Sequence, residues 1–352
     1  MEKKISISIL FIVFVFFSLL GSFSLPAVSE AKPITLSLSH FFPPTHFVNT
    51  EMVAQWVKEV EEASGGQMKI NVFPGGTLLK PRETYDGIVS GTGDIGVGVF
   101  AYTRGRFPVM EGFELPGIYF GSCTATTMVA VEGVKKFKPK ELEDTKLMFF
   151  YSVGPGSLYS KKRVATLGDL KGMRIRATGL TAKSIEALGA VPVAMPMPEA
   201  YEALSKGVVG GNIGPPEILK GWKQAEVTKY ITILPPVYNS IQYCVMNLKK
   251  WNSLAPDVRK AIEKVNEGFN VKAGQIWDSQ MKANGIDYGV NEHGMQIVRL
   301  SEEDNKKAME TMQPLLDDYI ARMNKKGLPG KEIVDFVKEN AAKYSKMYPT
   351  GY

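Results

Sequence analysis

The sequence has few of the residues, and none of the short motifs, on which enzymes and metal sites commonly depend. Only two cysteines and three histidines occur among its 352 residues. His40 and His46 lie six residues apart in the proline-containing loop SHFFPPTH, which supplies no third metal ligand. No G-x-S-x-G or H-E-x-x-H pattern occurs, and the paired glycines lack the spacing of a dinucleotide- or phosphate-binding loop. We therefore expect no catalytic residue, metal or cofactor, with a secreted hydrolytic enzyme kept as an alternative.

The two thiols, Cys123 and Cys244, would allow one disulfide in an oxidising compartment. Cys244, however, lies inside the apolar strand pattern from Ile241 to Met246. A free cysteine in such a place acts as a small buried hydrophobic side chain. We expect both thiols to be free.

Positive charge is not concentrated in any segment, although the formal net charge is +6. Lysines and arginines alternate with acidic residues, as at 58–62 and 302–307. No basic block with interleaved aromatic residues appears, which excludes nucleic acid as a partner. A positive net charge can still raise the local concentration of small anions.

Long apolar runs are also scarce, and the one at residues 5–25 follows Lys3 and Lys4. Small residues at Ser29 and Ala31 occupy the positions that a signal peptidase reads, so we predict a signal peptide over residues 1–31, cleaved after Ala31. The run is also long enough to span a membrane as a retained anchor. Since no second run of that length follows, we prefer cleavage and a periplasmic location.

Strand and helix periodicities alternate through the first half of the chain. Strands are predicted at 34–39, 68–72 and 94–99, and helices at 50–63 and 82–89. This order is typical of a largely parallel sheet covered by helices. Helix caps are expected at Asn49 or Thr50 and at Ser301. The last third predicts three long helices, at 257–281, 302–324 and 331–344.

The segment DLKGMRIRATG, from Asp169 to Gly179, places Arg174 and Arg176 in a short strand after a Gly/Lys turn. A guanidinium facing a cleft there would stay charged and match a carboxylate with two parallel hydrogen bonds. On these residues alone, a solvent-exposed strand is an equal alternative. LGAVPVAMPMPEAYEAL, VVGGNIGPPE and VYNSIQYCVMNLKKWNSLAPDVRKAI follow in that order. With this order and spacing, the chain from Ile34 to about Tyr344 resembles the DctP-type solute-binding proteins of TRAP transporters, the tripartite ATP-independent periplasmic importers of organic acids.

The resemblance implies a two-lobed α/β periplasmic binding protein fold. Mixed sheets flanked by helices would enclose a ligand cleft between the lobes, and a long helix would span both. Residues 32–153 and 242–281 would form lobe one, residues 154–241 and 282–330 lobe two, and a C-terminal helix in 331–352 would pack on the lobes. The implied partners are a small organic acid and the small and large membrane subunits of a TRAP permease. We expect the protein to be a monomer.

The resemblance also implies where the acid is held. Arg176 is the second arginine of the family pattern G-x-[KR]-x-R, which pairs with the substrate carboxylate in relatives. Sialic-acid-binding members have a further arginine where this chain has Gly156, and an acid where it has Val99. They have a phenyl ring in place of Met197 and an amide in place of Gly214. Each difference replaces charge or polarity with apolar surface or open space, so a larger and more apolar pocket is expected.

Further candidates for the pocket are aromatic and amide side chains near the ends of the predicted strands. They are Phe41, Phe42, Phe100, Tyr102 and Tyr238, the amides Asn212, Asn239 and Gln242, and His40 at the cleft edge. Sites for small ligands are mostly apolar with a few placed polar groups. The hypothesis is a monocarboxylate with an apolar or aromatic body, such as an aryl or branched-chain keto acid. A ligand-binding sensor subunit of the same fold is the alternative.

Overall fold

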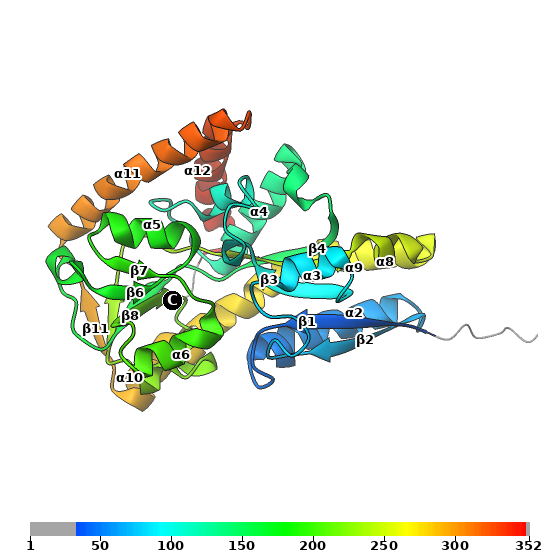
Figure 1. Cartoon of the computed structure of the whole chain (residues 1–352), viewed down its shortest axis with the longest axis horizontal. Coiled ribbons are helices and arrows are strands. Elements are labelled where there is room, and N and C mark those ends of the chain that lie inside the picture. The colour runs from blue at the N-terminus through cyan, green and yellow to red at the C-terminus, as the bar shows by residue number, and fades with distance from the viewer. Residues whose placement is uncertain (1–32, 350–352) are drawn as a thin grey trace, which may run out of the picture. The chain divides into compact units, whose positions relative to one another are not determined.

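The computed structural model describes residues 33–349, so the predicted signal peptide at 1–31 lies outside the described residues. Within this described range, eleven strands form two sheets (Figure 1). The first has the order β2-β1-β3-β10-β4 and the second β11-β9-β5-β8-β6-β7. The first contains β1 (Ile34–His40), β2 (Met68–Phe73), β3 (Ile95–Val99), β4 (Thr145–Ser152) and β10 (Ile241–Asn247). The second contains β5 (Ser157–Ser160), β6 (Arg174–Arg176), β7 (Val191–Val193), β8 (Gly211–Gly214), β9 (Tyr230–Ile233) and β11 (Gln296–Arg299).

Helices flank both sheets and connect their strands. The helical elements that precede or follow strands of the first sheet are the π-helix η1 (Val48–Val53), α2 (Ala54–Ala63), α3 (Thr84–Ser90), η2 (Phe100–Tyr102), η3 (Met110–Glu114), α4 (Cys123–Phe137), η4 (Lys140–Leu142) and α8 (Leu248–Ser253). Around the second sheet lie η5 (Leu167–Leu170), α5 (Gly179–Ala187), α6 (Met197–Ser205), α7 (Ile218–Gly221), η6 (Gln224–Glu226), η7 (Lys282–Ile286) and α10 (Asp287–His293). The three long helices are α9 (Pro256–Met281), α11 (Glu302–Lys325) and α12 (Gly330–Met347).

The predicted β-α-β-α-β order is confirmed, since β1 pairs in parallel with both β2 and β3. β10 inserts antiparallel between β3 and β4, which makes the sheet mixed. In the second sheet β6 pairs in parallel with β7 and β8, and β5 runs antiparallel to β8. The carboxyl ends of β1, β3 and β4 therefore lie at one edge of the first sheet, where ligands commonly bind in open α/β sheets.

The predicted helix start at Asn49 or Thr50 is wrong. The helical segment begins earlier, as η1 at Val48, so both residues lie inside it. The Asn49 side chain donates to the Pro44 carbonyl and contacts the His40 ring instead of capping. A single sequence gives no sign of a π-helix, because its hydrogen bonds skip one residue more than those of an α-helix.

The long helix predicted at residues 257–281 is confirmed as α9. Its buried residues Ile262, Phe269 and Trp277 recur at helical spacing and pack into the core. Gly274 lets the helix approach α4 closely, because a Cβ atom there would lie 2.6 Å from the Cα of Thr124. α9 contacts α2, α4 and β4, which belong to the part of the molecule around the first sheet. The element η7 follows α9 directly and contacts α7, which lies beside the second sheet.

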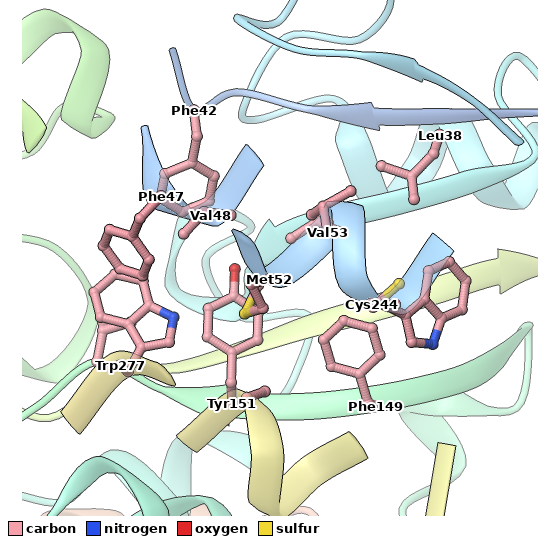
Figure 2. Close-up of a cluster of buried hydrophobic side chains, with 14 of the residues drawn as sticks. Leu38, Phe42, Phe47, Val48, Met52, Val53, Phe149, Tyr151, Cys244 and Trp277 are labelled. Carbon is pink, nitrogen blue, oxygen red and sulfur yellow. The ribbon is translucent and has the colours of Figure 1, made fainter. Parts of the chain in front are cut away.

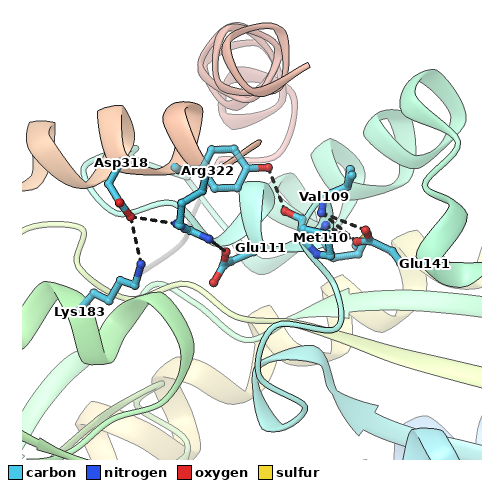
Figure 3. Close-up of polar contacts among 9 residues, drawn as sticks. Val109, Met110, Glu111, Glu141, Lys183, Asp318 and Arg322 are labelled. Carbon is cyan, nitrogen blue, oxygen red and sulfur yellow. Dashed lines mark hydrogen bonds and ion pairs between the residues drawn. The ribbon is translucent and has the colours of Figure 1, made fainter. Parts of the chain in front are cut away.

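The helix predicted from residue 302 is also confirmed, and Ser301 caps it by accepting a hydrogen bond from the Asp304 backbone. This helix, α11, joins separate parts of the molecule through the polar contacts in Figure 3. Asp318 on α11 accepts from Lys183 of α5 at 3.1 Å, and Arg322 on α11 donates to Glu111 of η3 at 2.8 Å. Because these side chains are partly exposed, we assign them an orienting role and little stabilisation.

Figure 2 shows part of the hydrophobic core that contains Phe47, Tyr151 and Trp277. Trp277 packs edge-on against Phe47 at 4.8 Å and stacks on Tyr151 at 5.9 Å between ring centroids. Cys244 lies in the same core, and both Cys123 and Cys244 are free and buried. Within residues 33–349, no helix combines the length and apolar character that crossing a membrane requires.

Candidate functional site

A small cavity lies where the strand ends of the two sheets meet. The first sheet contributes Phe41 and Phe42 after β1, Val99 at the end of β3, and Val153 after β4. The second sheet contributes Arg176 at the end of β6 and Pro215 after β8. The segments that connect β4 to β5 and β9 to β10 run past the same cavity, so a ligand there would touch both sheets.

Arg176 lines this cavity with a side chain that is only 2% exposed. The position of Arg176 at the end of β6 accounts for its burial. Ile175 points into the core below, whereas Arg174 is exposed at the start of the strand. The guanidinium Nε donates to the Met195 carbonyl at 2.9 Å, and this bond fixes the plane of the guanidinium. No ion pair among the described residues includes Arg176.

Two neutral side chains complete the surroundings of the guanidinium. Asn212 of β8 accepts a long hydrogen bond from Nη1 at 3.4 Å, and the Tyr102 hydroxyl accepts one from Nη2 at the same distance. Asn212 is held in turn by donating to Gln224 at 2.8 Å. A buried cation whose Nη groups make only long hydrogen bonds to neutral partners is costly. Both Nη atoms are therefore suited to a carboxylate entering the cavity.

Aromatic side chains are prominent in the cavity wall. Within residues 33–349, six of them line it: Phe41, Phe42, Tyr102, Trp222, Tyr238 and Trp277. The Phe41 ring lies nearly parallel to Trp222, with centroids 6.1 Å apart, and 5.6 Å from the Tyr102 ring. Met197 and Val99 add further apolar surface. Such a wall suits a flat apolar ligand body, which stacks on or against aromatic faces.

Polar groups other than Arg176 are few. Gln242 of β10 lines the cavity, and its Oε1 is buried with no hydrogen-bond partner in the described part of the chain. Thr178 and Ser240 add hydroxyl groups. Glu217 supplies a buried carboxyl group, which accepts from His46 Nε2 at 3.0 Å. Arg176 is the one lysine or arginine lining the cavity within residues 33–349.

Five of the site residues proposed from the sequence line the cavity: Arg176, Met197, Gln242, Phe41 and Tyr102. Phe42, Val99 and Tyr238, which the sequence also singled out, line it as well. Asn212 lies behind Arg176 and Gly214 at the end of β8 beside Met197. Their parts in ligand binding stay predictions.

Four other candidates have different surroundings. Phe100 packs against Phe107 and Tyr243 and borders a separate cavity. The His40 ring is buried against Asn49, and burial lowers its pKa to about 4, so it is neutral at physiological pH. Asn239 is occupied, since it accepts from Ser152 and donates to the Phe113 carbonyl.

Gly156 is the fourth of these candidates, and its small size has a packing reason. A Cβ atom there would lie 2.5 Å from both the Gly214 carbonyl oxygen and the Tyr238 ring. The segment that connects β4 to β5 therefore packs against the end of β8 with no side chain between them. Any larger residue, including an arginine, would displace the cavity wall.

The sequence interpretation missed three cavity residues with large or charged side chains, namely Glu217, Trp222 and Trp277. Glu217 ends the segment NIGPPE, in which an acid directly follows the turn at a strand end. That placement is the one signal that would have indicated it. Trp277 lies within a long amphipathic helix, where core packing is the default expectation. Groups of three or more potential metal-binding side chains are absent from residues 33–349.

The fold defines a two-lobed solute-binding protein, with the cavity described above between its lobes. The chain matches the family "Bacterial extracellular solute-binding protein, family 7" over residues 38–322, and it belongs to this family. The members of this family are periplasmic receptors for solutes and not enzymes. The DctP-type resemblance and the fold class are thereby confirmed.

Individual relatives are distant but cover almost the whole chain. The C4-dicarboxylate-binding periplasmic protein DctP of Rhodobacter capsulatus is 26% identical over 318 residues, which is 85% of this chain and 90% of that protein. A TRAP solute-binding protein from a marine metagenome, solved with 3-hydroxybenzoate, is 31% identical with a TM-score of 0.84, covering 89% and 99% of the two chains. One from Rhodoferax ferrireducens, solved with copurified benzoate, is 28% identical with a TM-score of 0.83 and the same coverage.

Proposed function

We propose that this protein captures an aromatic monocarboxylate in the cavity between its lobes and delivers it to a TRAP membrane permease. The observation that carries the proposal is the buried Arg176 guanidinium, which has no anionic partner among residues 33–349 and lines a cavity with six aromatic side chains in its wall. A ligand carboxylate would accept hydrogen bonds from the two Nη groups, which otherwise make only long ones. The aromatic wall would hold the ring of the ligand.

The relatives support the same ligand class. The marine and Rhodoferax proteins were solved with 3-hydroxybenzoate and benzoate respectively, and both are aromatic monocarboxylates. The DctP relative is named for C4-dicarboxylates, which require a partner for a second carboxylate. In this chain the cavity lining from residue 33 to residue 349 includes one arginine and no lysine, together with the acidic Glu217. A second ligand carboxylate would therefore lie in the cavity without a cationic partner.

The remaining parts of the proposal follow from the family. We infer export through the apolar segment at 1–31, action in the periplasm as a monomer, and docking of the closed lobes on the small and large permease subunits. Lobe one would comprise residues 32–153 and 242–281, and lobe two residues 154–241 and 282–330. The helix α11 contacts α5 of lobe two and, through Arg322, η3 of lobe one. Lobe closure about the crossing segments would then move α11 as well.

The ligand class is tested by calorimetric titration of the purified mature protein with a matched panel. The panel comprises benzoate, 3-hydroxybenzoate, phenylacetate, phenylpyruvate, 2-oxoisovalerate and succinate. We expect at least one aryl acid to bind about tenfold or more tightly than succinate, because only the aryl acids place both a carboxylate and a ring. Tight binding of succinate without binding of any aryl acid would overturn the proposal.

A further inference from the structure

The cavity contains an anionic side chain as well as a cationic one, and the two do not pair with each other. Glu217 is 2% exposed and lines the cavity that Arg176 also lines. Its Oε2 accepts from His46, whereas its Oε1 accepts no hydrogen bond from any residue between 33 and 349. Although the residue as a whole is buried, this oxygen is not among the fully buried atoms without a partner, so it can accept a hydrogen bond from a ligand in the cavity. Binding of a ligand carboxylate to Arg176 would not supply a hydrogen-bond donor to this oxygen.

The protonation of the pair follows from its hydrogen bonds. The Val48 backbone N–H donates to His46 Nδ1 at 3.2 Å, so Nδ1 carries no proton. The ring proton is therefore on Nε2, which donates to Glu217 Oε2 at 3.0 Å. This arrangement makes Glu217 an acceptor. Its free oxygen is suited to a ligand group that donates a hydrogen bond.

A row of aromatic side chains in pairwise contact links Arg176 to the His46 ring that holds Glu217. From the guanidinium, the row passes to the Tyr102 hydroxyl at 3.4 Å, and the Tyr102 ring lies 5.6 Å from Phe41. Phe41 lies 6.1 Å from Trp222, and Trp222 lies 5.5 Å from the His46 ring that holds Glu217. A flat ligand along this row, with its acid on Arg176, would direct its body toward Glu217.

Other polar atoms near Glu217 also lack partners. Trp277 Nε1 and the Tyr151 hydroxyl are buried without a hydrogen bond within the described residues. The pKa of Tyr151 is raised well above its usual value, chiefly by burial, and Glu217 is among the nearby groups that raise it further. Of these two residues Trp277 also lines the cavity, so a further hydrogen-bonding side chain accompanies Glu217 there. Such an arrangement suits a ligand body that ends in a polar substituent.

We propose that Glu217, held by His46, accepts a hydrogen bond from a hydroxyl group on the aromatic ring of the ligand, so that the protein selects hydroxyaryl acids over their unsubstituted parents. The inference rests on the proposed function, because it requires the ligand acid to lie on Arg176. It assigns a specificity role to a residue pair, one on the loop before η1 and one after β8. A bound ligand would exclude solvent from the Glu217 oxygen, and an unsubstituted ring would then offer it no donor, a mismatch that discriminates strongly between ligands.

The test measures dissociation constants of 3-hydroxybenzoate, 4-hydroxybenzoate and benzoate by calorimetry, for the wild-type protein and for two variants. In the wild type, we expect one hydroxybenzoate to bind about tenfold or more tightly than benzoate. In Glu217→Gln, which keeps an oxygen for His46 but turns an N–H donor to the cavity, this preference should fall to about threefold or less.

Gly221→Ala perturbs the pair without changing its charge. A Cβ atom at Gly221 would lie 2.6 Å from both Glu217 Oε2 and His46 Nε2, so the two side chains must shift. The hydroxyl preference should decrease here too. Arg176→Lys serves as the matched control, because it should weaken all three ligands by a similar factor and leave their ratio unchanged. Circular dichroism and thermal unfolding establish that each variant is folded.

Each outcome has one meaning. Binding of benzoate within about threefold of both hydroxybenzoates in the wild type overturns the role of Glu217 but leaves the proposed function standing. An unchanged preference in folded Glu217→Gln overturns it as well. Tighter binding of 4-(aminomethyl)benzoate than of either hydroxybenzoate would show that Glu217 recognises a cation instead. Failure of every aryl acid to bind would contradict the proposed function itself.

Discussion

Replacing Arg176 with alanine is expected to weaken the binding of an aryl acid by roughly 2–4 kcal/mol, which is about a 30- to 900-fold increase in Kd. The variant removes the one arginine or lysine that lines the cavity within residues 33–349. The ligand carboxylate would then be buried among aromatic side chains without a charged donor. Lysine should restore little of the loss, since it lacks the planar fork of donors.

Arg174→Ala is the matched control for this measurement. Arg174 lies two residues earlier in β6 and is exposed, so its removal changes the net charge equally without touching the cavity. Calorimetric titration should give Arg174→Ala an affinity within about twofold of the wild type. An Arg176→Ala protein that is folded and binds within about threefold of the wild type would show that the acid is held elsewhere.

Raising the pH from 6.5 to 8 is expected to destabilise the protein through Glu114. This carboxyl group is buried, and its Oε1 accepts from the Ile241 backbone at 2.7 Å. Burial raises the pKa of Glu114 to about 8, against the opposing effect of the Ile241 hydrogen bond. Between its unfolded and folded pKa values, the folded protein holds a proton that the unfolded chain has released. Stability therefore falls as the pH rises through this window, by about 1–2 kcal/mol from pH 6.5 to 8.

Glu114→Gln tests this linkage, because glutamine resembles the protonated carboxyl group and keeps an oxygen for Ile241. The variant should lose the Glu114 contribution to the pH dependence, so its free energy of unfolding relative to the wild type should rise by about 1–2 kcal/mol between pH 6.5 and 8. His40 contributes the opposite slope at lower pH, since burial lowers its pKa to about 4. The part of this contribution that extends above pH 6.5 is the same in the variant and the wild type, so it cancels from their difference. Parallel curves for variant and wild type in urea unfolding would contradict the assignment.

The sequence predicted the regular parts of the fold well. The strands β1, β2 and β3 and the helix α9 have strong periodicity and lie within a residue or two of the expected ranges. The placement of Arg176 depended on a short strand between a turn and a cleft, which the pattern and the family resemblance indicated together. Such features are local, so they can be recognised from neighbouring residues alone.

The cavity wall was harder to predict, because burial does not tell which cavity or core a side chain faces. Phe100 and Tyr102 lie two residues apart in the short helical turn η2, yet Phe100 packs into a separate core and Tyr102 reaches Arg176. Glu217 and His46 are 171 residues apart in sequence and meet only through the tertiary fold. Contacts of this kind depend on the arrangement of the two sheets, which periodicity does not define.

All of the proposed function depends on one guanidinium between two lobes that holds the acid group of an aromatic ligand. A crystal structure of the protein grown with 3-hydroxybenzoate would show this contact. We expect the ligand carboxylate about 2.7–2.9 Å from the Arg176 Nη atoms, with the ring among Phe41, Trp222 and Tyr238. A bound ligand whose carboxylate contacts other residues, with Arg176 turned away from it, would rule out Arg176 as the acid-binding residue.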